Sequence, residues 1–174
     1  MIEYTHLKQF IRDIPDFPRP GILFRDITPL LSDQAALTAA IDALAGPFEN
    51  DGIDLVAAVE ARGFIFGSAV AQRIGAGFVP IRKRGKLPWQ TARLSYDLEY
   101  GQDTIEVHRD AVGGGRRVLM IDDLLATGGT MVAACKLIES LGATITGLTF
   151  LVELSALAGR DLLQSYRIHS VIKY

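Results

Sequence analysis

The sequence is poor in the residues that build disulfides and zinc sites. It has one cysteine, Cys135, in 174 residues, which excludes a disulfide within the chain and a cysteine-rich zinc site. The three histidines, His6, His108 and His169, are scattered and lack the spacing of metal ligands. Cys135 lies within an apolar helical pattern, where a packed core thiol is more common than a nucleophile. We therefore expect neither zinc nor thiol chemistry, and a reducing compartment.

A long apolar run and an excess of one charge are also missing. No stretch approaches the ~18–20 apolar residues that cross a bilayer, and residues 1–13 carry charges in place of the apolar segment of a signal peptide. Lysine and arginine number 18 against 20 aspartates and glutamates, a formal charge of −2. This balance argues against nucleic acid as a partner. We expect a cytoplasmic protein that binds neither nucleic acid nor a membrane.

What is present is an ordinary globular composition. Hydrophobic residues make up 49% of the chain and charged residues 22%, which is enough apolar surface for a real core. The length is that of one typical domain. Because no repeat, linker or low-complexity tract interrupts it, we expect a single domain over residues 1–174.

The apolar spacing and the turn residues predict alternating strands and helices. Residues 4–14 are expected to form an amphipathic helix, and the proline-rich residues 15–26 an extended segment. Ser32 is the expected N-cap of a helix over 35–44. Pro80 suggests an irregular or edge position in its strand. The remaining strands are expected at 54–59, 77–82, 91–96, 104–108, 117–121, 143–152 and 168–172, and the remaining helices at 63–74, 129–141 and 156–164. This order predicts an α/β fold with a mostly parallel, twisted sheet flanked by helices.

The segment Val118–Thr130, VLMIDDLLATGGT, combines three chemical features. An apolar strand ends in the adjacent acids Asp122 and Asp123, and ligands of open α/β sheets bind where strands end. Carboxylates there can accept hydrogen bonds from a vicinal diol or hold a hydrated Mg²⁺. The alternative that involves no ligand is a strand end with two solvated acids.

The residues Ala126, Thr127, Gly128, Gly129 and Thr130 then open a helix. Glycines let the backbone approach a ligand closely, and the free N–H groups at a helix N-terminus suit a phosphate. The two threonines add hydroxyl donors. The whole segment therefore predicts a site for a phosphorylated sugar.

This segment resembles the phosphoribosyl diphosphate (PRPP) motif of the type I phosphoribosyltransferases. The chain contains neither a Walker A loop nor a G-x-G-x-x-G dinucleotide fingerprint. Further stretches, in order along nearly the whole chain, resemble the adenine phosphoribosyltransferases. These stretches are Pro15–Leu31, Glu60–Gly67, Ile81–Pro88, Ser95–Gly101 and Leu151–Leu154.

The resemblance implies a diphosphate site built from basic residues. Arg62, in the Glu60–Gly63 loop, is the implied charged contact, because an arginine fork matches phosphate oxygens. Arg82, Lys83 and Lys86 are implied to add positive charge. A homodimer is also implied, in which these side chains can reach a neighbouring subunit.

The resemblance assigns the rest of the substrate to other parts of the chain. Asp122 and Asp123 would hold the ribose hydroxyls, directly or through water on the cofactor Mg²⁺, and Ala126–Thr130 would wrap the 5′-phosphate. The implied fold has a small N-terminal hood, residues 1–32, on a core of residues 33–174. The implied adenine-binding residues of the hood are Leu23, Phe24 and Arg25. From its residue type alone, Phe24 is as often a core residue as a stacking platform.

Residues Ser95–Gly101 resemble the family's mobile catalytic loop. Glu99 would manage a proton near the purine, and Tyr100 would help to exclude water, which could otherwise hydrolyse the activated ribose. Residues 89–93, WQTAR, depart from the family pattern, so the stem of the loop can pack differently from that of the family.

The implied reaction is adenine plus PRPP giving AMP plus diphosphate, a step of purine salvage, with Arg62, Glu99, Asp122 and Asp123 as the catalytic group. Two alternatives stand beside it. One is a regulatory protein that senses PRPP without turnover, which the slightly negative charge and the lack of a helix-turn-helix pattern disfavour. The other is a transferase for hypoxanthine or xanthine.

Overall fold

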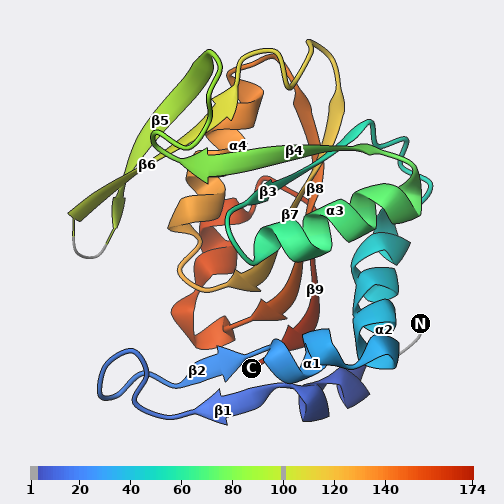
Figure 1. The fold of residues 1–174 in the computed structure, drawn as a ribbon, viewed down its shortest axis with the longest axis vertical. Helices are drawn as coiled ribbons and strands as arrows, with labels where there is room; N and C mark the ends of the chain where they lie inside the picture. The colour runs from blue at the N-terminus through green and yellow to red at the C-terminus, as the bar shows by residue number, and fades with distance from the viewer. Residues whose placement is uncertain (1–3, 99–100) are drawn as a thin grey trace.

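A computed structural model describes residues 4–98 and 101–174 of the chain. Its centre is a seven-stranded sheet with the order β5-β6-β4-β3-β7-β8-β9 (Figure 1). The strands are β1 (Arg12–Ile14), β2 (Phe24–Asp26), β3 (Leu55–Val59), β4 (Gly77–Lys83), β5 (Thr91–Leu98), β6 (Gly101–His108), β7 (Arg117–Leu125), β8 (Thr144–Glu153) and β9 (Ile168–Lys173). The α-helices are α1 (Thr28–Ser32), α2 (Gln34–Ala45), α3 (Gly63–Ile74) and α4 (Gly129–Glu139). The 3₁₀ helices are η1 (Thr5–Phe10), η2 (Gly46–Phe48), η3 (Ser155–Leu157) and η4 (Gly159–Leu163).

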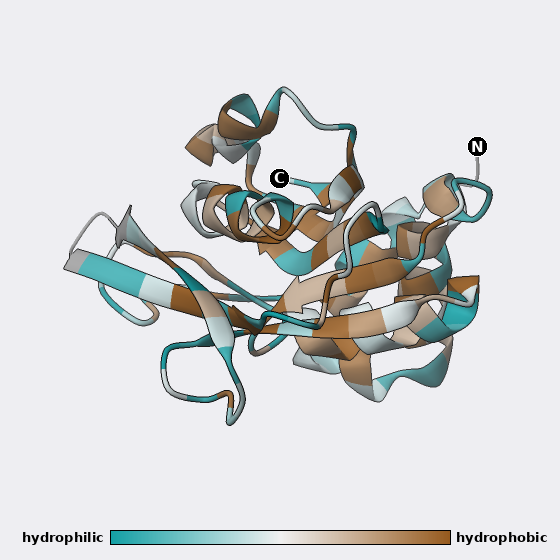
Figure 2. Ribbon diagram, turned by 90° about the horizontal axis from the view of Figure 1, so that it is seen from above, coloured by the Kyte–Doolittle hydropathy of each residue, from teal (hydrophilic) through white to brown (hydrophobic). Residues whose placement is uncertain are grey.

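The sheet is mostly parallel, as the sequence predicts. Strands β4, β3, β7, β8 and β9 run parallel, each hydrogen-bonded to the next. Strands β5 and β6 form an antiparallel hairpin, and β6 joins it to the end of β4. In Figures 1 and 2 this hairpin projects away from the body of the molecule.

The core forms two layers because the central strands are apolar on both faces. In β3, Val56 and Ala58 face the layer that contains α2 and α3. Leu55, Ala57 and Val59 face the opposite layer, which contains α4. All five side chains are buried, which explains why the strand is a continuous apolar run with no polar residue. Figure 2 shows the resulting hydrophobic centre of the sheet.

Helix α3 begins and ends where the sequence predicts. Its C-cap, Gly75, has φ +74°, the left-handed conformation that glycine adopts readily. A Cβ at Gly67 would lie 2.7 Å from the Phe78 ring and 2.8 Å from the Ala58 Cβ. Glycine at position 67 therefore sets how closely α3 approaches the sheet.

The N-terminal segment differs from the expected helix. The apolar spacing of residues 4–14 corresponds to the 3₁₀ helix η1 followed by strand β1, which pairs antiparallel with β2. Leu7 and Ile11 are nevertheless buried against the core, so the pattern marked the inward-facing residues correctly. The prediction of an α-helix is wrong because the same spacing is also satisfied by a 3₁₀ turn that leads into a short strand.

Two smaller expectations need correction, and one is confirmed. The N-cap of α2 is Asp33, whose carboxylate accepts a hydrogen bond from Ala36 N at 2.8 Å, whereas Ser32 ends α1. Pro80 occupies a local edge position, as the sequence predicts: it pairs with Ala58 of β3, and β6 pairs with β4 only at Arg82 and Lys83. The helix expected at 156–164 is the pair of 3₁₀ turns η3 and η4.

Among the helices of the described residues, none is both long enough and apolar enough to span a membrane.

We predict that Gly67→Ala lowers the free energy of unfolding by about 1–3 kcal/mol, because the added methyl overfills a packed contact between helix and sheet. Urea unfolding followed by circular dichroism measures the change. Gly46→Ala is the matched control, since a Cβ there meets nothing within 4 Å. Equal stability of the two variants would contradict this account of the packing.

Candidate active site

Three neighbouring parallel strands end at one edge of the sheet. Val59 of β3 is paired with Ile81 of β4, and Ala58 is paired with Ile121 of β7. Beyond the last β3 residue, Glu60 N still donates a hydrogen bond to Ile81 O at 3.0 Å. The register therefore places the loop after β3 beside Asp122 and Asp123. These acids were expected to end their strand, but they lie within β7, which stays paired with β8 as far as Leu125.

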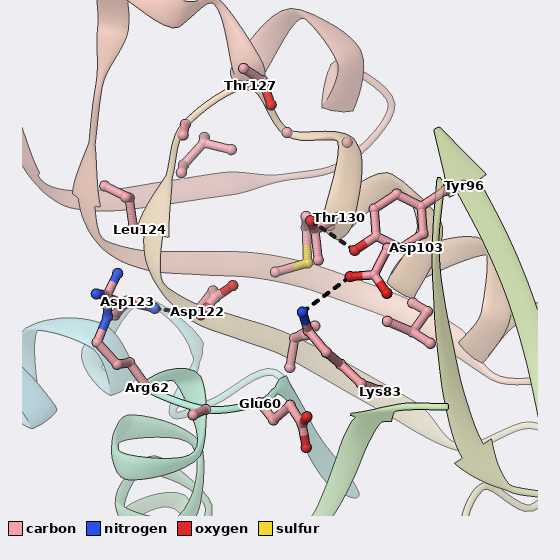
Figure 3. Close-up of a pocket in the computed structure, with 18 residues that line it drawn as sticks. Glu60, Arg62, Lys83, Tyr96, Asp103, Asp122, Asp123, Leu124, Thr127 and Thr130 are labelled. Atoms are coloured by element: carbon pink, nitrogen blue, oxygen red, sulfur yellow. Dashed lines mark hydrogen bonds and ion pairs between the residues drawn. The ribbon is translucent and has the colours of Figure 1, made fainter. Parts of the chain in front are cut away.

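A cleft of about 560 Å³ opens at this edge (Figure 3). Its walls come from the loops after β3 and β7, from the end of β4 and from the hairpin. The cleft is lined by Val59, Glu60, Ala61, Arg62, Lys83, Tyr96, Asp103, Ile105 and residues 122–131. This set includes both predicted acids, two of the four predicted basic residues and the whole predicted phosphate loop.

The acids Asp122 and Asp123 lie at the floor of the cleft. Arg62 Nε donates a hydrogen bond to Asp123 Oδ2 at 2.6 Å. Burial, reinforced by the charge of Asp123, raises the pKa of Asp122 well above its ordinary value. A Cβ at Gly63 would lie 2.8 Å from Asp122 Oδ1, so glycine allows α3 to begin directly against this carboxylate. The pair offers several acceptor oxygens to hydroxyl donors of a ligand.

The loop 126–130 turns from β7 into α4. Gly128 is the N-cap of the helix and has φ +83°, which favours glycine. The first turn of any α-helix has N–H groups without a partner inside the helix, and here they belong to the lining of the cleft. The Tyr96 hydroxyl lies 3.2 Å from Thr130 Oγ1 and ties the hairpin to the start of α4. The loop therefore presents polar groups that suit an anion.

Lys83 approaches the cleft from the opposite side, at the end of β4. Its Nζ is 3.3 Å from Asp103 Oδ2 of β6, and both side chains point into the cleft in Figure 3. A second cation thus faces the acids and the phosphate loop across the open space.

The other two predicted basic residues are held by a carboxylate behind the cleft wall. Arg82 Nε is 2.7 Å and Lys86 Nζ 2.9 Å from oxygens of Glu60, whose side chain is 7% exposed. Although burial raises the pKa of Glu60, the hydrogen bonds from Lys86 and Arg82 bring it below the ordinary value. Arg82 and Lys86 do not line the cleft, but they join its Glu60 wall to the turn after β4.

The predicted base-binding residues belong to β2 and the turn before it, beside the cleft. The Arg62 guanidinium lies 5.3 Å from the centre of the Phe24 ring, so one side chain contacts both β2 and Asp123. The Arg25 side chain is paired with Asp13 and stacks 3.8 Å from the Tyr174 ring. Leu23 is 45% exposed. Among these three residues, the side chain that approaches the lining is that of Phe24.

Glu99 and Tyr100, the predicted catalytic-loop residues, lie outside the described residues.

Comparison with known proteins agrees with this geometry. Residues 27–172 match the family model of the phosphoribosyl transferase domain. Adenine phosphoribosyltransferase of Methylococcus capsulatus is 58% identical to this chain, over 97% of this chain and 98% of the relative. The chain belongs to the adenine phosphoribosyltransferase family.

Solved structures of this family have the same fold. Adenine phosphoribosyltransferase of Thermoanaerobacter pseudethanolicus superposes with a TM-score of 0.95 at 53% identity, covering 98% of this chain and 99% of the other. The enzyme of Saccharomyces cerevisiae, complexed with adenine and an imino-altritol bisphosphate, gives a TM-score of 0.91 at 37% identity, covering 97% of each chain. These similarities confirm the type I phosphoribosyltransferase fold that the sequence predicts.

The sequence argument gave no individual role to four polar residues in or near the cleft, although Glu60 and Tyr96 lie in stretches that it singled out. Glu60, Tyr96 and Asp103 line the cleft and bind other site residues, and Glu106 organises the turn after β4. For Tyr96, Asp103 and Glu106, the local signal was the alternation of residues along β5 and β6. This alternation predicted the strands but not the residues that these side chains contact. A charged residue such as Glu106 in an apolar alternation could have indicated a buried partner.

Glu106 is fully buried in β6 and accepts hydrogen bonds from the turn that follows β4. Its Oε1 accepts hydrogen bonds from the backbone N–H groups of Gly85, Lys86 and Leu87 at 2.9–3.2 Å. Its Oε2 is 3.0 Å from Arg93 Nε. Burial raises the pKa of Glu106, but the N–H groups of Leu87 and Gly85 and the charge of Arg93 together lower it below the ordinary value. One carboxylate thus fixes the backbone that carries Lys86.

We predict that Glu106→Gln lowers the free energy of unfolding by about 1–3 kcal/mol at neutral pH, because an amide replaces one acceptor oxygen with a donor. A lowered folded-state pKa stabilises above the unfolded-state pKa, and this contribution is lost as pH falls through the folded-state pKa. The difference from the unmodified chain should therefore shrink in acid.

Urea unfolding at neutral and at acid pH measures both effects. Glu49→Gln is the control, since Glu49 is 38% exposed and pairs with Arg73 at the surface. A pH-independent difference would show that the charge of Glu106 is not what matters.

Proposed function

We propose that this chain transfers the 5-phosphoribosyl group of PRPP to N9 of adenine, giving AMP and diphosphate in purine salvage. One observation carries the proposal: a single cleft joins paired acids, a glycine-opened helix N-terminus and two cations. The acids suit ribose, the helix start suits a phosphate and the cations suit a diphosphate. The relatives named adenine phosphoribosyltransferase support adenine as the base.

In this proposal the 5′-phosphate binds at Ala126–Thr130. Backbone N–H groups at the start of α4 and the hydroxyls of Thr127 and Thr130 are the donors, and the positive end of the helix dipole adds to them. The ribose hydroxyls donate to Asp122 and Asp123. A ligand that spans both sites is oriented at its two ends, which leaves C1′ directed toward the open part of the cleft.

The diphosphate takes the side of the cleft that carries Arg62 and Lys83. A guanidinium has five N–H donors, so Arg62 can hold Asp123 through Nε and still offer donors to phosphate oxygens. Arg82 and Lys86 are proposed to add positive charge from behind Glu60 or toward a neighbouring subunit. N9 attacks C1′, the bond from C1′ to the diphosphate oxygen breaks, and the electron pair leaves with the diphosphate. Positioning and stabilisation of this leaving-group charge are the main tasks of the protein.

Magnesium fits this donor set as a substrate-bound ion. Within residues 4–98 and 101–174, no three or more carboxylate, histidine or cysteine side chains gather as a metal cluster. Mg²⁺ typically keeps several waters and binds through one or two carboxylates and substrate phosphates, a role that Asp122 and Asp123 could share. When bound, the ion would neutralise charge on the diphosphate.

The remaining assignments are proposals that rest on the family resemblance. Leu23, Phe24 and Arg25 are proposed to contact adenine, with Phe24 against the ring. Glu99 is proposed to accept or relay the N9 proton, and Tyr100 to exclude water. The division into a hood of residues 1–32 and a core of 33–174, the homodimer and the cytoplasmic location also stay predictions.

We predict AMP formation from adenine and PRPP with Mg²⁺, and a kcat/KM at least about tenfold lower for hypoxanthine, guanine and xanthine, because a site built for one pattern of donors and acceptors leaves polar groups unpaired with another. Steady-state assays with each base measure this. Nucleotide formation from another base at higher efficiency would reassign the substrate, and no product with any base would refute the enzyme proposal in favour of a PRPP-binding regulator.

We predict that Asp123→Asn lowers kcat/KM for PRPP by at least about tenfold, because it removes a charged hydrogen-bond acceptor and the ion pair with Arg62. Thermal unfolding checks that the variant folds. The control is Asp42→Asn, which removes a surface pair with Arg73 away from the cleft. A folded Asp123→Asn variant with unchanged kinetics would remove the ribose site from this cleft.

A further inference from the structure

The 3₁₀ turn η4 lies directly against the backbone of the loop 126–130. Gly159, the first residue of η4, is buried. A Cβ on Gly159 would lie 2.1 Å from Ala126 O and 2.9 Å from both Gly128 N and Thr127 C. All three are backbone atoms of the loop, so no flexible side chain could move aside. The two backbones touch, and there is no room for a side-chain carbon between them.

The contact is reciprocal. A Cβ on Gly128 would lie 2.6 Å from Gly159 O and 3.2 Å from Gly159 Cα. Gly128 also needs glycine for its φ of +83°, but Gly159 is not in the left-handed region. The absence of a side chain at Gly159 is therefore explained by the close approach and not by its own backbone conformation.

The turn itself is firmly anchored to the sheet. Arg160 donates from Nε and Nη2 to the two carboxylate oxygens of Glu153, at 2.9 and 2.6 Å. The Arg160 guanidinium also bonds Ser170 Oγ and Ile168 O of β9. Hydrogen bonding to Arg160 lowers the pKa of Glu153 to about 2, so the pair stays charged at neutral pH. Leu163, at the other end of η4, is fully buried in the core.

Glu153, which anchors η4, lies beside the residue that leads into the loop 126–130. Glu153 is the last residue of β8 and is paired with Leu125, the last residue of β7, which leads into the loop. Leu154 N continues this pairing with a hydrogen bond to Leu125 O at 2.9 Å. The chain then passes through η3 and returns over the loop at Gly159. A fourth strand end thus contributes to the site without lining the cleft.

We propose that Gly159 is a positioning residue for the 5′-phosphate of the substrate. Its backbone holds residues 126–128 in the conformation whose N–H groups face the phosphate, and Arg160 holds Gly159 in place. The inference rests on the proposed function, since it assigns the phosphate to that loop. The benefit is preorganisation: a loop that is already ordered loses less entropy when it binds its ligand.

The test compares Gly159→Ala with Gly46→Ala, whose added Cβ meets nothing within 4 Å and lies away from the cleft. Isothermal titration calorimetry measures the Kd for ribose 5-phosphate and for diphosphate with Mg²⁺. We expect Gly159→Ala to weaken ribose 5-phosphate binding about tenfold or more, since a displacement of about 1 Å can have a large effect at such a site. Diphosphate binding should change less than about twofold, and KM for PRPP should rise more than kcat falls.

Two outcomes would overturn the inference. The first is unchanged ribose 5-phosphate binding by Gly159→Ala. The second is an equal loss of ribose 5-phosphate and diphosphate binding, which would indicate general damage to the fold.

If Gly159→Ala does not fold, Arg160→Lys decides the matter, because lysine cannot reproduce the fork on Glu153. It should weaken ribose 5-phosphate binding severalfold and spare diphosphate, and wild-type binding of both ligands would refute the inference. If the variant selectively loses ribose 5-phosphate binding but the unmodified chain forms no nucleotide with any base, the enzyme proposal is refuted and the positioning role of Gly159 stands.

Discussion

The active-site geometry depends on the parallel register of β4, β3 and β7. In a parallel sheet each residue is fixed relative to its neighbours by hydrogen bonds along the whole strand, and all strands end at the same edge. Because Ala58 is paired with Ile121, the loop that begins at Glu60 must meet the acids that follow Ile121. A shift of one residue would move every side chain of β7, those of Asp122 and Asp123 included, to the other face of the sheet. The apolar pairing in the core therefore determines the position of charges that contribute little to it.

Charge compensation inside the cleft follows from this crowding. Arg62 pairs with Asp123, Lys83 with Asp103, and Glu60 takes both Arg82 and Lys86. The carboxylates of these pairs are mostly buried, whereas the cations keep 35–58% of their side-chain surface exposed. Because the cations stay partly exposed and carry several N–H donors, each can bind a phosphate oxygen and still keep its buried carboxylate partner. The acids hold the basic side chains near the cleft, and the proposed substrate supplies stronger partners.

The sequence predicted best those parts that local patterns determine. Strands β3 and β8, the first five residues of β7, helix α3 and the cluster from Asp122 to Thr130 follow from apolar runs, glycine positions and adjacent acids. The N-terminal segment was predicted less well, because the spacing of residues 4–14 fits a helix and also a 3₁₀ turn followed by a strand.

The residues that no local pattern could reveal are those whose partners are distant in sequence. Glu106 accepts hydrogen bonds from backbone N–H groups some twenty residues earlier in the sequence, and Gly159 contacts a loop more than thirty residues earlier. One sequence alone records neither contact. A buried carboxylate inside an apolar strand is at least chemically conspicuous, since an unpaired charge there would be strongly destabilising. A lone glycine before an arginine carries no such signal.

Three glycines near the cleft, Gly63, Gly128 and Gly159, share one physical role. A Cβ at Gly63 would meet the Asp122 carboxylate, one at Gly128 would meet the backbone of Gly159, and one at Gly159 would meet the backbone of residues 126–128. Each marks a place where segments from different strand ends approach more closely than side chains permit. The contact between Gly128 and Gly159 holds the loop by main-chain atoms, which have no rotamers, so the N–H groups of the loop need little rearrangement to face an anion. For a ligand bound largely through backbone donors, the accuracy of the site then comes from the packing of Gly159, which does not line the cleft, against Gly128 of the loop.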